Sequence, residues 1–526
     1  MMRRQTVFVC LLIGLWACGP ATRDMGDDTM KDGDNDGFTP AGGDCNDADP
    51  NVHPGATEVC NDGIDNDCNG TTDTNDYACF TPCEKAAHDR SSVGCVYYSV
   101  DTNSLGNPFA IAVSNIDDTT TANVVIEMKT GTTWAPIPMG TFTVGPRMLK
   151  TVTPACRFAM DSQLYAGGAY RITSDLPVIS YQFAPIDGST SFLSDASLLL
   201  PTSAFDQYYI VSAWPYGPDI GNTPRPAHIQ IVAAEPTNVT VTSPIASMAG
   251  TGAPALAPSV PQVYAMQEGD YLQLTVLTLN ESFTGTYIEA DKPVAVFSSN
   301  DCANVPNVAA ECCCDHLEEQ LFGLQTWGTS YVGAQMPRRQ TEGSIWQILA
   351  QQDATTITFQ PSAGVTGLPP SVTLNARQKV EYEVKGGATP GDFLVTSDKP
   401  ILVNQFTVGS FHVQANSDVG DPDMVQAVPT EQFLAHYNIL IPSTWINDFL
   451  VITRHAGANV MVDGIEPAAT WNPVPGGWET TVIPAADGVH TLDSTTPFGV
   501  AVSGYDQYDS YSYPGGLNQT VINPIF

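Results

Sequence analysis

Most of the chain after Cys95 alternates hydrophobic and polar residues over short runs that end at Gly, Pro, Asn or Asp. In the stretch HIQIVAAEPTNVTVTSP, at 228–244, this alternation occurs on both sides of a Glu-Pro-Thr-Asn sequence. The hydrophobic positions are Ile229, Ile231, Val239 and Val241. A period of two is typical of strands, and the polar residues between them favour a turn. The pattern predicts a β-hairpin here and an all-β fold for this part of the chain.

A longer pattern recurs in the same region: a Gly, an aromatic strand, an Asp-x-Pro turn and a second apolar strand. It appears as GAYRITSDLPVISYQF from Gly168, GTYIEADKPVAVF from Gly285 and GDFLVTSDKPILVNQF from Gly391, with a degenerate copy, TTPFGVAVSGY, from Thr495. The turn residues Asp175, Asp291 and Asp398 are separated by 116 and 107 residues. Repeats of this length indicate four similar units, each with six or seven short strands, of about 100 residues over 97–526.

Two arrangements of these units fit the pattern. The units can pair into a propeller-like closed ring, which leaves no sheet edge exposed, or they can form tandem β-sandwiches. We expect the ring, because no linker sequence separates one copy from the next. The sandwiches remain the alternative.

The overall charge limits the possible partners. The 526 residues include 56 Asp and Glu but only 20 Lys and Arg, which gives a formal net charge of −36. A phosphate backbone must be met by basic residues, so nucleic acid is excluded as a natural partner. Hydrophobic residues make up 43% of the chain, which is sufficient for packed cores.

The N-terminus predicts export. Arg3 and Arg4 precede an apolar run too short for a permanent membrane helix, which is typical of a signal peptide at 1–17. The run ends in Leu-Trp-Ala-Cys, which resembles a bacterial lipobox and implies acylation of Cys18 at the head of a tether, 18–23. Because Trp16 is bulky for that motif, cleavage by the ordinary signal peptidase is the alternative. We expect a lipid-anchored protein of the bacterial outer membrane and cell surface, which contacts membrane only through the anchor.

Residues 24–79 form an acidic, cysteine-rich segment with the spacing of calcium loops. The first loop has the D-x-D-x-D-G pattern at Asp32, Asp34 and Asp36, with Asp44 one residue beyond the usual last position. The second loop fits D-x-[DN]-x-[DN]-G-x5-[DE] more closely. Its candidate ligands are Asp65, Asp67, Asn69, Thr71, Asp73 and Asp76. These ligands are hard oxygens, which favour calcium as the cofactor.

The stretch from Asp32 to Gly70, DGDNDGFTPAGGDCNDADPNVHPGATEVCNDGIDNDCNG, resembles a metal-binding repeat of secreted bacterial proteins named after a copper-binding surface protein. It is also similar to thrombospondin type 3 calcium repeats. The disulfide candidates near it are Cys45, Cys60, Cys68, Cys79, Cys83 and Cys95. We expect the pairs Cys45–Cys60 and Cys68–Cys79, followed by a linker at 80–95.

Three further stretches resemble the N-terminal region of IgG Fc-binding proteins. They are SDASLLLPTSAFDQYYIV from Ser194, EADKPVAVFSSNDCANVP from Glu289 and CDHLEEQLFGLQTWGTSYV from Cys314. The resemblance covers roughly 400 residues and implies that 96–526 is a binding or adhesive domain with a protein or glycan partner at the cell surface. It supplies no catalytic residues. We therefore expect a non-enzymatic surface protein.

One short run contains residue types that are typical of metal or catalytic sites. Cys312, Cys313, Cys314, Asp315, His316, Glu318 and Glu319 lie within eight residues. A zinc site or a thiol nucleophile is conceivable, but in an exported protein a disulfide from Cys302 to one of these cysteines, such as Cys314, is the simpler interpretation. Asp421 and Asp423 flank Pro422 in a predicted turn. The alternative function is a secreted hydrolase of glycans or peptides on a propeller scaffold.

Overall fold

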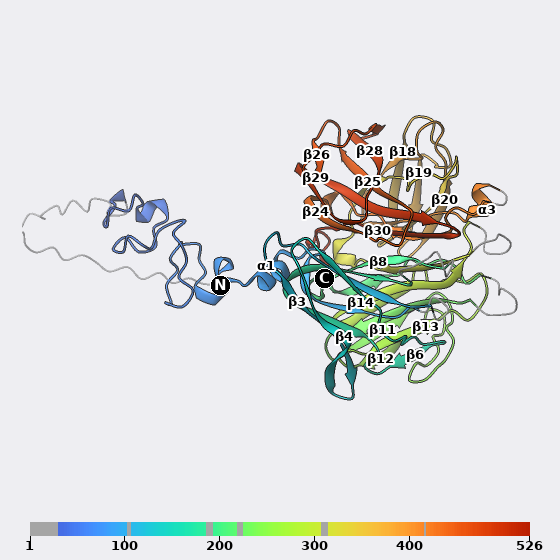
Figure 1. The fold of residues 1–526 in the computed structure, drawn as a ribbon, viewed down its shortest axis with the longest axis horizontal. Coiled ribbons are helices and arrows are strands. Elements are labelled where there is room, and N and C mark those ends of the chain that lie inside the picture. Colours follow the sequence, from blue (N-terminus) through green and yellow to red (C-terminus); the bar gives the residue numbers. More distant parts are fainter. Residues whose placement is uncertain are drawn as a thin grey trace, which may run out of the picture. The chain divides into compact units, whose positions relative to one another are not determined.

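The computed structural model describes residues 30–102, 107–185, 193–217, 225–306, 314–414 and 417–525 (Figure 1). The chain divides into two compact units, Met1–Thr81 and Pro82–Phe526. The expected signal peptide, the tether and Cys18 lie outside the described residues. None of the described helices has the length and apolar character needed to cross a membrane.

The first unit, from residue 30 onward, is held together by loops and disulfides. Its regular elements are the 3-10 helices η2 (Pro40–Gly42), η3 (Asp73–Asn75) and η4 (Tyr77–Cys79). The disulfides are Cys45–Cys68 and Cys60–Cys79, so both expected pairings are wrong. The His53 amide donates to the Asn66 carbonyl at 2.9 Å, which places the two segments side by side and brings Cys68 to Cys45.

The second unit is all-β, as the sequence predicts, and the whole structure is 47% strand and 7% helix. The first group of strands forms a seven-stranded sheet of β1 (Gly94–Ser99), β2 (Ala110–Asn115), β3 (Ala122–Thr130), β4 (Thr133–Val144), β5 (Leu149–Val152), β7 (Tyr170–Phe183) and β8 (Ala196–Leu199). The second forms an eight-stranded sheet of β6 (Gln163–Tyr165), β9 (Asp206–Ile210), β10 (Ala227–Ala233), β11 (Thr237–Thr242), β12 (Gln262–Met266), β13 (Tyr271–Thr275), β14 (Tyr287–Ala303) and β15 (Asp315–Gln320).

The third group divides into two four-stranded sheets. They are β16 (Ser330–Gly333), β18 (Thr355–Pro361), β19 (Ser371–Leu374) and β21 (Phe393–Ser397), and β17 (Ser344–Ala350), β20 (Lys379–Val384), β22 (Ile401–Phe406) and β23 (Met424–Gln426). The fourth group has β24 (Leu434–Ile441), β25 (Asn447–His455), β26 (Val460–Val462), β27 (Asn472–Val474), β28 (Trp478–Pro484), β29 (Gly488–Asp506) and β30 (Asp509–Pro514). Short 3-10 helices connect successive groups: η5 (Thr202–Ala204), η6 (Leu324–Thr326) and η7 (Thr430–Gln432). Another short helix, α3 (Ser410–Val413), lies within the third group between β22 and β23.

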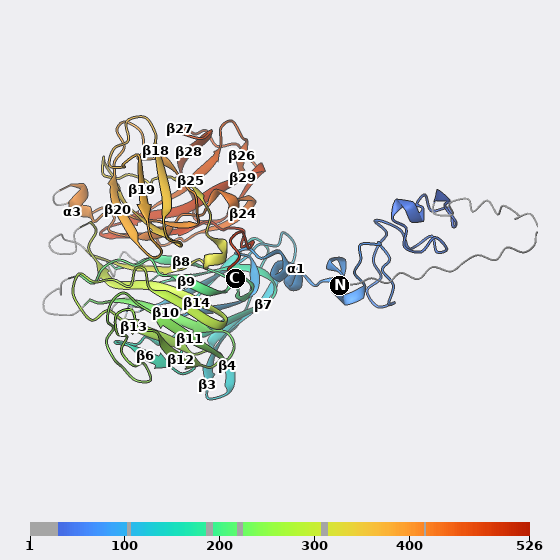
Figure 2. The same cartoon turned by 180° about the vertical axis from the view of Figure 1, so that it is seen from behind.

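The segment expected as a linker contains α1 (Pro82–Asp89), which packs on β1 and β7. The disulfide Cys83–Cys95 joins this helix to β1. In both ribbon views the C-terminus lies beside α1 (Figures 1 and 2). Ser91 forms a β-bridge with Asn518, so the beginning and the end of the second unit meet.

The repeated Asp-x-Pro sequence forms a corner. In β14, Ile288 pairs with Val241 of β11 before the corner, and Val296 pairs with Ile231 of β10 after it. The predicted hairpin is therefore wrong, because β10 and β11 lie on either side of β14 and do not pair with each other. The alternation identified two strands correctly but carried no information about their partner.

The same corner contact recurs in three units. The Asn123 side chain donates to Asp175 at 2.6 Å, the Asn238 side chain donates to Asp291 at 2.8 Å, and the Thr356 amide donates to Asp398 at 2.8 Å. In each unit the corner carboxylate thus holds the neighbouring strand. These contacts show that the sequence repeat is also a structural repeat.

Hydrophobic clusters join the four strand groups in a circle. One cluster joins the first and second groups, others join the second to the third and the third to the fourth, and the largest joins the fourth to the first. The sheets themselves are nearly closed and barrel-like. The second unit, here called the β domain, is therefore a closed ring of barrel-like units, which combines the two arrangements that the sequence allowed.

Candidate functional site

The first acidic loop brings three carboxylates together. Ligand atoms of Asp32, Asp34 and Asp36 all lie within 4.8 Å of one another. Asp32 accepts hydrogen bonds from the Asn35 amide at 2.6 Å and the Gly37 amide at 3.1 Å, which closes the loop. Gly37 has a φ of 102°, a value that other residues rarely adopt. The alternate spacing of the aspartates therefore directs their side chains to one point.

Asp44 lies near this loop, because its charge acts on Asp34. Partial burial, followed by repulsion from Asp36, Asp44 and Asp32, raises the pKa of Asp34 above its ordinary value. The Oδ2 atoms of Asp34, Asp36 and Asp44 are buried and have no hydrogen-bond partner among the described residues. Buried carboxylate oxygens without donors are costly unless a cation neutralises them. The loop therefore fits a metal ion with oxygen ligands.

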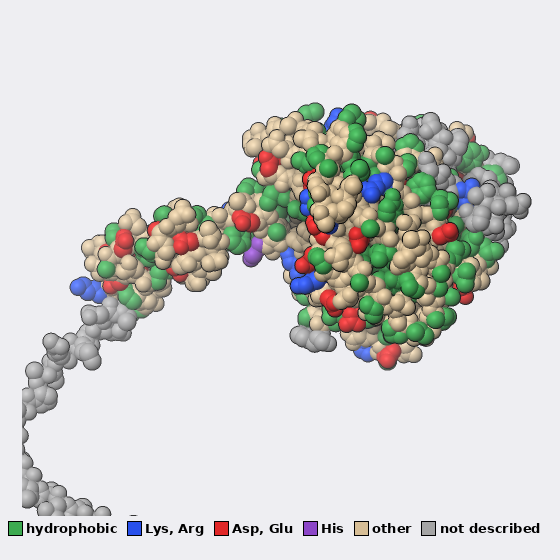
Figure 3. All heavy atoms as spheres, turned by 90° about the horizontal axis from the view of Figure 1, so that it is seen from below, with side chains coloured by type: hydrophobic (Ala, Val, Ile, Leu, Met, Phe, Trp, Pro, Cys, Tyr) green, Lys and Arg blue, Asp and Glu red, His purple; other side chains and the backbone are tan. Residues whose placement is uncertain are grey.

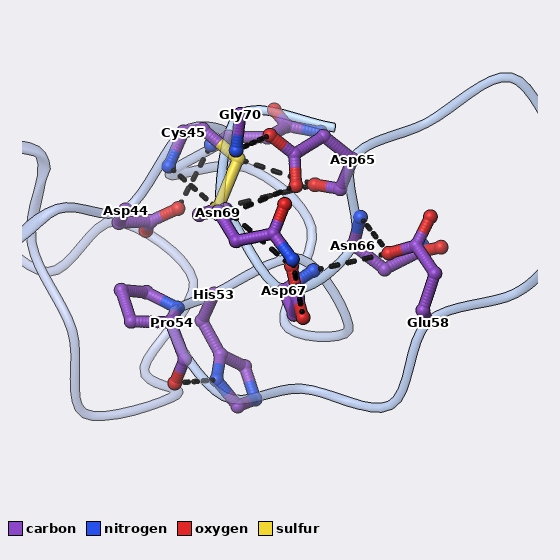
Figure 4. Close-up of a disulfide and its surroundings, with 12 residues drawn as sticks. Asp44, Cys45, His53, Pro54, Glu58, Asp65, Asn66, Asp67, Asn69 and Gly70 are labelled. Carbon is purple, nitrogen blue, oxygen red and sulfur yellow. Dashed lines mark hydrogen bonds between the residues drawn. A yellow bond between two sulfur atoms is a disulfide. The ribbon is translucent and has the colours of Figure 1, made fainter. Parts of the chain in front are cut away.

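The second group consists of Glu58, Asp65 and Asp67, whose ligand atoms also lie within 4.8 Å of one another. Figure 4 shows these residues around the Cys45–Cys68 disulfide. Here the carboxylates already accept hydrogen bonds from the loop. Asp65 accepts from the Gly70 amide at 2.8 Å, and Glu58 accepts from the Asn66 amide at 2.9 Å. These bonds form the loop, and the carboxylates keep lone pairs for an ion.

The remaining predicted ligands lie differently. Asp76 accepts hydrogen bonds from the side chains of Asn69 and Thr71, each at 2.8 Å. The Ala78 amide and these side chains lower the pKa of Asp76. Asp73 instead accepts from the Gly63 amide at 3.1 Å. These four residues thus stabilise the loop, and none of them belongs to the compact carboxylate groups.

The loop pattern did not include Glu58 as a candidate ligand, because it precedes the loop by seven residues. Its carboxylate also accepts from the Asp73 amide at 3.1 Å and is almost completely buried. The signal available in the sequence was the Glu of the ATEVC segment, within the stretch that resembles a metal-binding repeat. Only the folded loop shows that Glu58 reaches Asp65 and Asp67.

Soft ligands are scarce in this module. Its four described cysteines form disulfides. The His53 ring stacks on Phe38 with centroids 4.8 Å apart, and its Nδ1 lies 3.2 Å from the Pro54 carbonyl. The potential ligand atoms that converge in the module are therefore carboxylate oxygens, which are hard ligands.

The run with possible catalytic chemistry lies inside the β domain as strand β15. His316 is completely buried, and its Nε2 lies 3.1 Å from the Thr102 hydroxyl. Glu318 accepts from Thr102 at 2.5 Å and from the Gln182 side chain at 2.9 Å. Residues from separate strand groups thus meet here in a structural network. The expected disulfide is present as Cys302–Cys314, whereas Cys312 and Cys313 lie outside the described residues.

The comparisons with known proteins agree with both parts of this description. The family model described as IgGFc binding protein matches residues 195–504. A second model, the Cu-binding MopE metal-binding motif, matches residues 44–74. The human IgGFc-binding protein is 27% identical over 270 residues, which cover 49% of this chain and 5% of that protein. The chain therefore corresponds to a small part of the length of this relative.

Proposed function

Since the chain belongs to the IgGFc-binding protein family, we propose that it is an exported surface protein whose β domain binds a protein partner and whose N-terminal module binds calcium. The observation that carries the proposal is the extent of the family match, which runs from the residue before β8 into β29. The match thus covers most of the closed ring. Recognition of immunoglobulin Fc is one form that this binding could take, because that is what the name of the human relative states.

The surface of the β domain suits a protein partner. On the face shown in Figure 3 most side chains are uncharged, and the charged ones are scattered. The net charge of −36 favours a basic partner, whose association would slow as salt rises. The outer edge of β12 is one suitable contact surface, because among the described strands β12 pairs only with β11 and it carries Val263 with 54% of its surface exposed.

A hydrolase remains the alternative function. Its strongest candidates in the sequence, His316, Glu318 and Glu319, are completely buried, and burial raises the pKa of Glu319 well above its ordinary value. Glu319 also accepts a hydrogen bond from Ser197 at 3.1 Å. These contacts support a structural role, so we propose that the β domain binds without catalysis.

We further propose that Cys18 carries the lipid anchor and that the protein lies on the bacterial cell surface. The proposal rests on the basic N-terminal residues, the apolar run and the Leu-Trp-Ala-Cys sequence. Mass spectrometry of the membrane fraction should show a diacylated N-terminal Cys18. In a Cys18→Ser variant the protein should leave the membrane fraction, and an unmodified N-terminus at another residue would contradict the anchor.

The calcium proposal rests mainly on the first loop, with its three carboxylate oxygens that lack donors. Isothermal titration of the chelated full chain should show calcium binding, with the site of the first loop lost in Asp34→Asn. Asp49→Asn is the matched control, because Asp49 lies in the same module and belongs to neither carboxylate group. Tighter binding of copper than of calcium, unaffected by Asp34→Asn, would contradict calcium.

Contact through β12 is tested with Val263→Lys. This variant should weaken binding to a protein ligand, because a charge would be placed on the contact surface. Ile446→Lys is the control, since Ile446 is 75% exposed in the fourth strand group. Equal binding by both variants would show that the partner contacts another surface.

The hydrolase alternative is tested with glycosidase and protease substrate panels. These panels should show no turnover, and turnover that is lost in His316→Ala would favour the hydrolase.

A further inference from the structure

Four strands meet at the centre of the ring, one from each strand group: β8, β15, β23 and β30. In the ribbon, β8 and β30 lie between the halves formed by the first two and the last two groups (Figure 1). Each strand begins with, or directly follows, a completely buried aspartate: Asp195, Asp315, Asp423 and Asp509. Together with Asp421, also completely buried, these residues are called the acidic hub below.

Two members of the hub tie the strand groups together. Asp195, in the first group, accepts hydrogen bonds from the Glu318 amide at 3.0 Å and the Met424 amide at 3.4 Å. Asp315, in the second group, accepts from the Ser194 amide at 2.6 Å and the Ser510 amide at 3.2 Å. These two carboxylates therefore have structural partners from other groups.

The other members have oxygens without donors. Neither carboxylate oxygen of Asp423 has a hydrogen-bond partner among the described residues, and the same holds for Oδ2 of Asp421 and of Asp509. Burial raises the pKa of both Asp421 and Asp423 to about 7, and the nearby Ser410 and Ser512 side chains oppose this rise at Asp421 and Asp423 respectively. The hydroxyls of these two serines are also buried and have no hydrogen bond of good geometry. An unpaired ionised carboxylate in a dry interior is costly, so this arrangement needs either bound protons or a compensating cation.

The hub carboxylates lie close enough to repel one another. Repulsion by Asp423 raises the pKa of Asp195, after the larger effect of burial. Repulsion by Asp509 and Asp421 acts on Asp315 in the same way. Hydrogen bonds to shared serines also place three members close together. The Ser510 amide donates to Asp315 at 3.2 Å and the Ser510 hydroxyl accepts from the Asp421 amide at 2.9 Å, while the Ser194 hydroxyl donates to Asp509 at 2.9 Å.

The described basic residues do not neutralise this charge. Arg339 only partly opposes the rise in pKa that burial causes at Asp421 and Asp423, and its guanidinium already pairs with Glu342 at 3.4 Å and donates to the Val419 carbonyl at 3.2 Å. One shared guanidinium cannot offset five buried carboxyl groups if they are ionised.

We propose that the acidic hub binds a divalent cation, calcium by its oxygen-only donor set, and that this ion holds the four strand groups in the closed ring. The ligands are Asp421, Asp423 and Asp509, with the Ser410 and Ser512 hydroxyls beside them. Calcium takes about six to eight oxygen ligands in flexible geometries. Among the described residues, only the two carboxylate groups of the N-terminal module have ligand atoms within 4.8 Å of one another. Binding of an ion at the hub therefore requires its carboxylate side chains to rotate toward one another.

This site is independent of the N-terminal module, and its test must keep the two apart. The parent for the test is the full chain with Asp34→Asn, Asp36→Asn, Asp65→Asn and Asp67→Asn, which disables both module loops. After gel filtration in calcium, elemental analysis should find about one calcium ion per chain. If the parent holds none, the hub proposal is wrong, whereas the proposed module sites are unaffected by that result.

Adding Asp423→Asn to the parent distinguishes neutralisation of the hub by a bound cation from neutralisation by protons on its carboxyl groups. If a cation is bound, the variant loses the ion, and chelator lowers the melting temperature of the β domain in the parent but not in the variant. Asp487→Asn, at an exposed position of the same domain, should behave as the parent. If protons neutralise the hub instead, Asp423→Asn leaves the metal content unchanged and keeps or raises the melting temperature, which overturns the proposal. Should this variant fail to fold, the metal content of the parent alone decides.

Discussion

The Tyr209 hydroxyl donates a hydrogen bond of 2.6 Å to the carbonyl of Val294, the residue after the Asp-x-Pro corner of β14. An equivalent bond occurs in each of the other strand groups: Tyr97 to Val178, Tyr331 to Ile401 and Tyr437 to Phe498. All four acceptors follow the corner proline, and all four tyrosines are buried. The bond therefore fixes the corner within β7, β14 and β29 and the equivalent corner between β21 and β22.

Replacing Tyr209 with Phe should destabilise the β domain by about 1–2 kcal/mol, because the Val294 carbonyl would be left buried without a donor. Denaturant unfolding followed by tryptophan fluorescence measures this loss. Tyr208→Phe is the matched control, since the half-buried hydroxyl of Tyr208 has no hydrogen-bond partner among the described residues. Equal stability of the two variants would show that the bond contributes nothing.

The sequence showed the repeat but not the pairing. Asp175, Asp291 and Asp398 marked equivalent positions, and the structure confirms that they make equivalent contacts. The partner of a strand depends on residues far away in the chain, so alternation at Ile229 and Val239 could not reveal that β14 lies between them. Local patterns specify elements, whereas long-range packing specifies their order.

The candidate sites show the same contrast between local sequence patterns and long-range packing. Alternate spacing was enough to find Asp32, Asp34 and Asp36, because the ligands of one loop are local in sequence. Asp423 and Asp509 come from different strand groups, so no local spacing connects them. The turn expected around Pro422 gave no sign that Asp421 and Asp423 are buried, and only the closure of the ring brings them together.

Asp392 should make stability depend on pH. Burial raises its pKa from 3.8 to about 6, although its carboxylate accepts hydrogen bonds from the Thr480 hydroxyl and the Gln335 amide. As pH rises from about 4 to about 6, the unfolded chain releases this proton before the folded chain does. The free energy of unfolding should therefore fall by up to about 3 kcal/mol and then level off.

The measurement is denaturant unfolding at several pH values for the wild type and for Asp392→Asn. The variant should lose this part of the decline, because the amide does not titrate. Asp487→Asn should keep the wild-type slope, since its carboxylate lies at an exposed position. Identical slopes for the wild type and Asp392→Asn would contradict the assignment.

The disulfides of the module should be found as Cys45–Cys68 and Cys60–Cys79. Peptide mapping of the unreduced protein checks the pairing directly. Loss of the Cys60–Cys79 bond in a Cys60→Ser/Cys79→Ser variant should destabilise the module by about 3 kcal/mol, as expected for a loop of 19 residues. Recovery of a peptide that joins Cys45 to Cys60 would show that the pairing is different.

Chelation should loosen the N-terminal module. Val52 is the only hydrophobic residue that is buried among residues 30–81, so a packed core contributes little to stability there. With calcium tenfold above its dissociation constant, linkage stabilises a site by about 1.4 kcal/mol, so chelation should raise proteolysis within 30–81 about tenfold. In Asp34→Asn chelation should have a smaller effect. Mass spectrometry of timed digests measures the cleavage, and equal rates with and without chelator would argue against a bound ion.

Binding by the β domain is best measured by biolayer interferometry, with the immobilised full chain titrated with a panel of purified extracellular proteins that includes immunoglobulin Fc. We predict saturable, salt-sensitive binding to at least one protein, without turnover of that protein. The absence of saturable protein binding, together with cleavage of a glycan or peptide substrate by the same preparation, would contradict the proposed function.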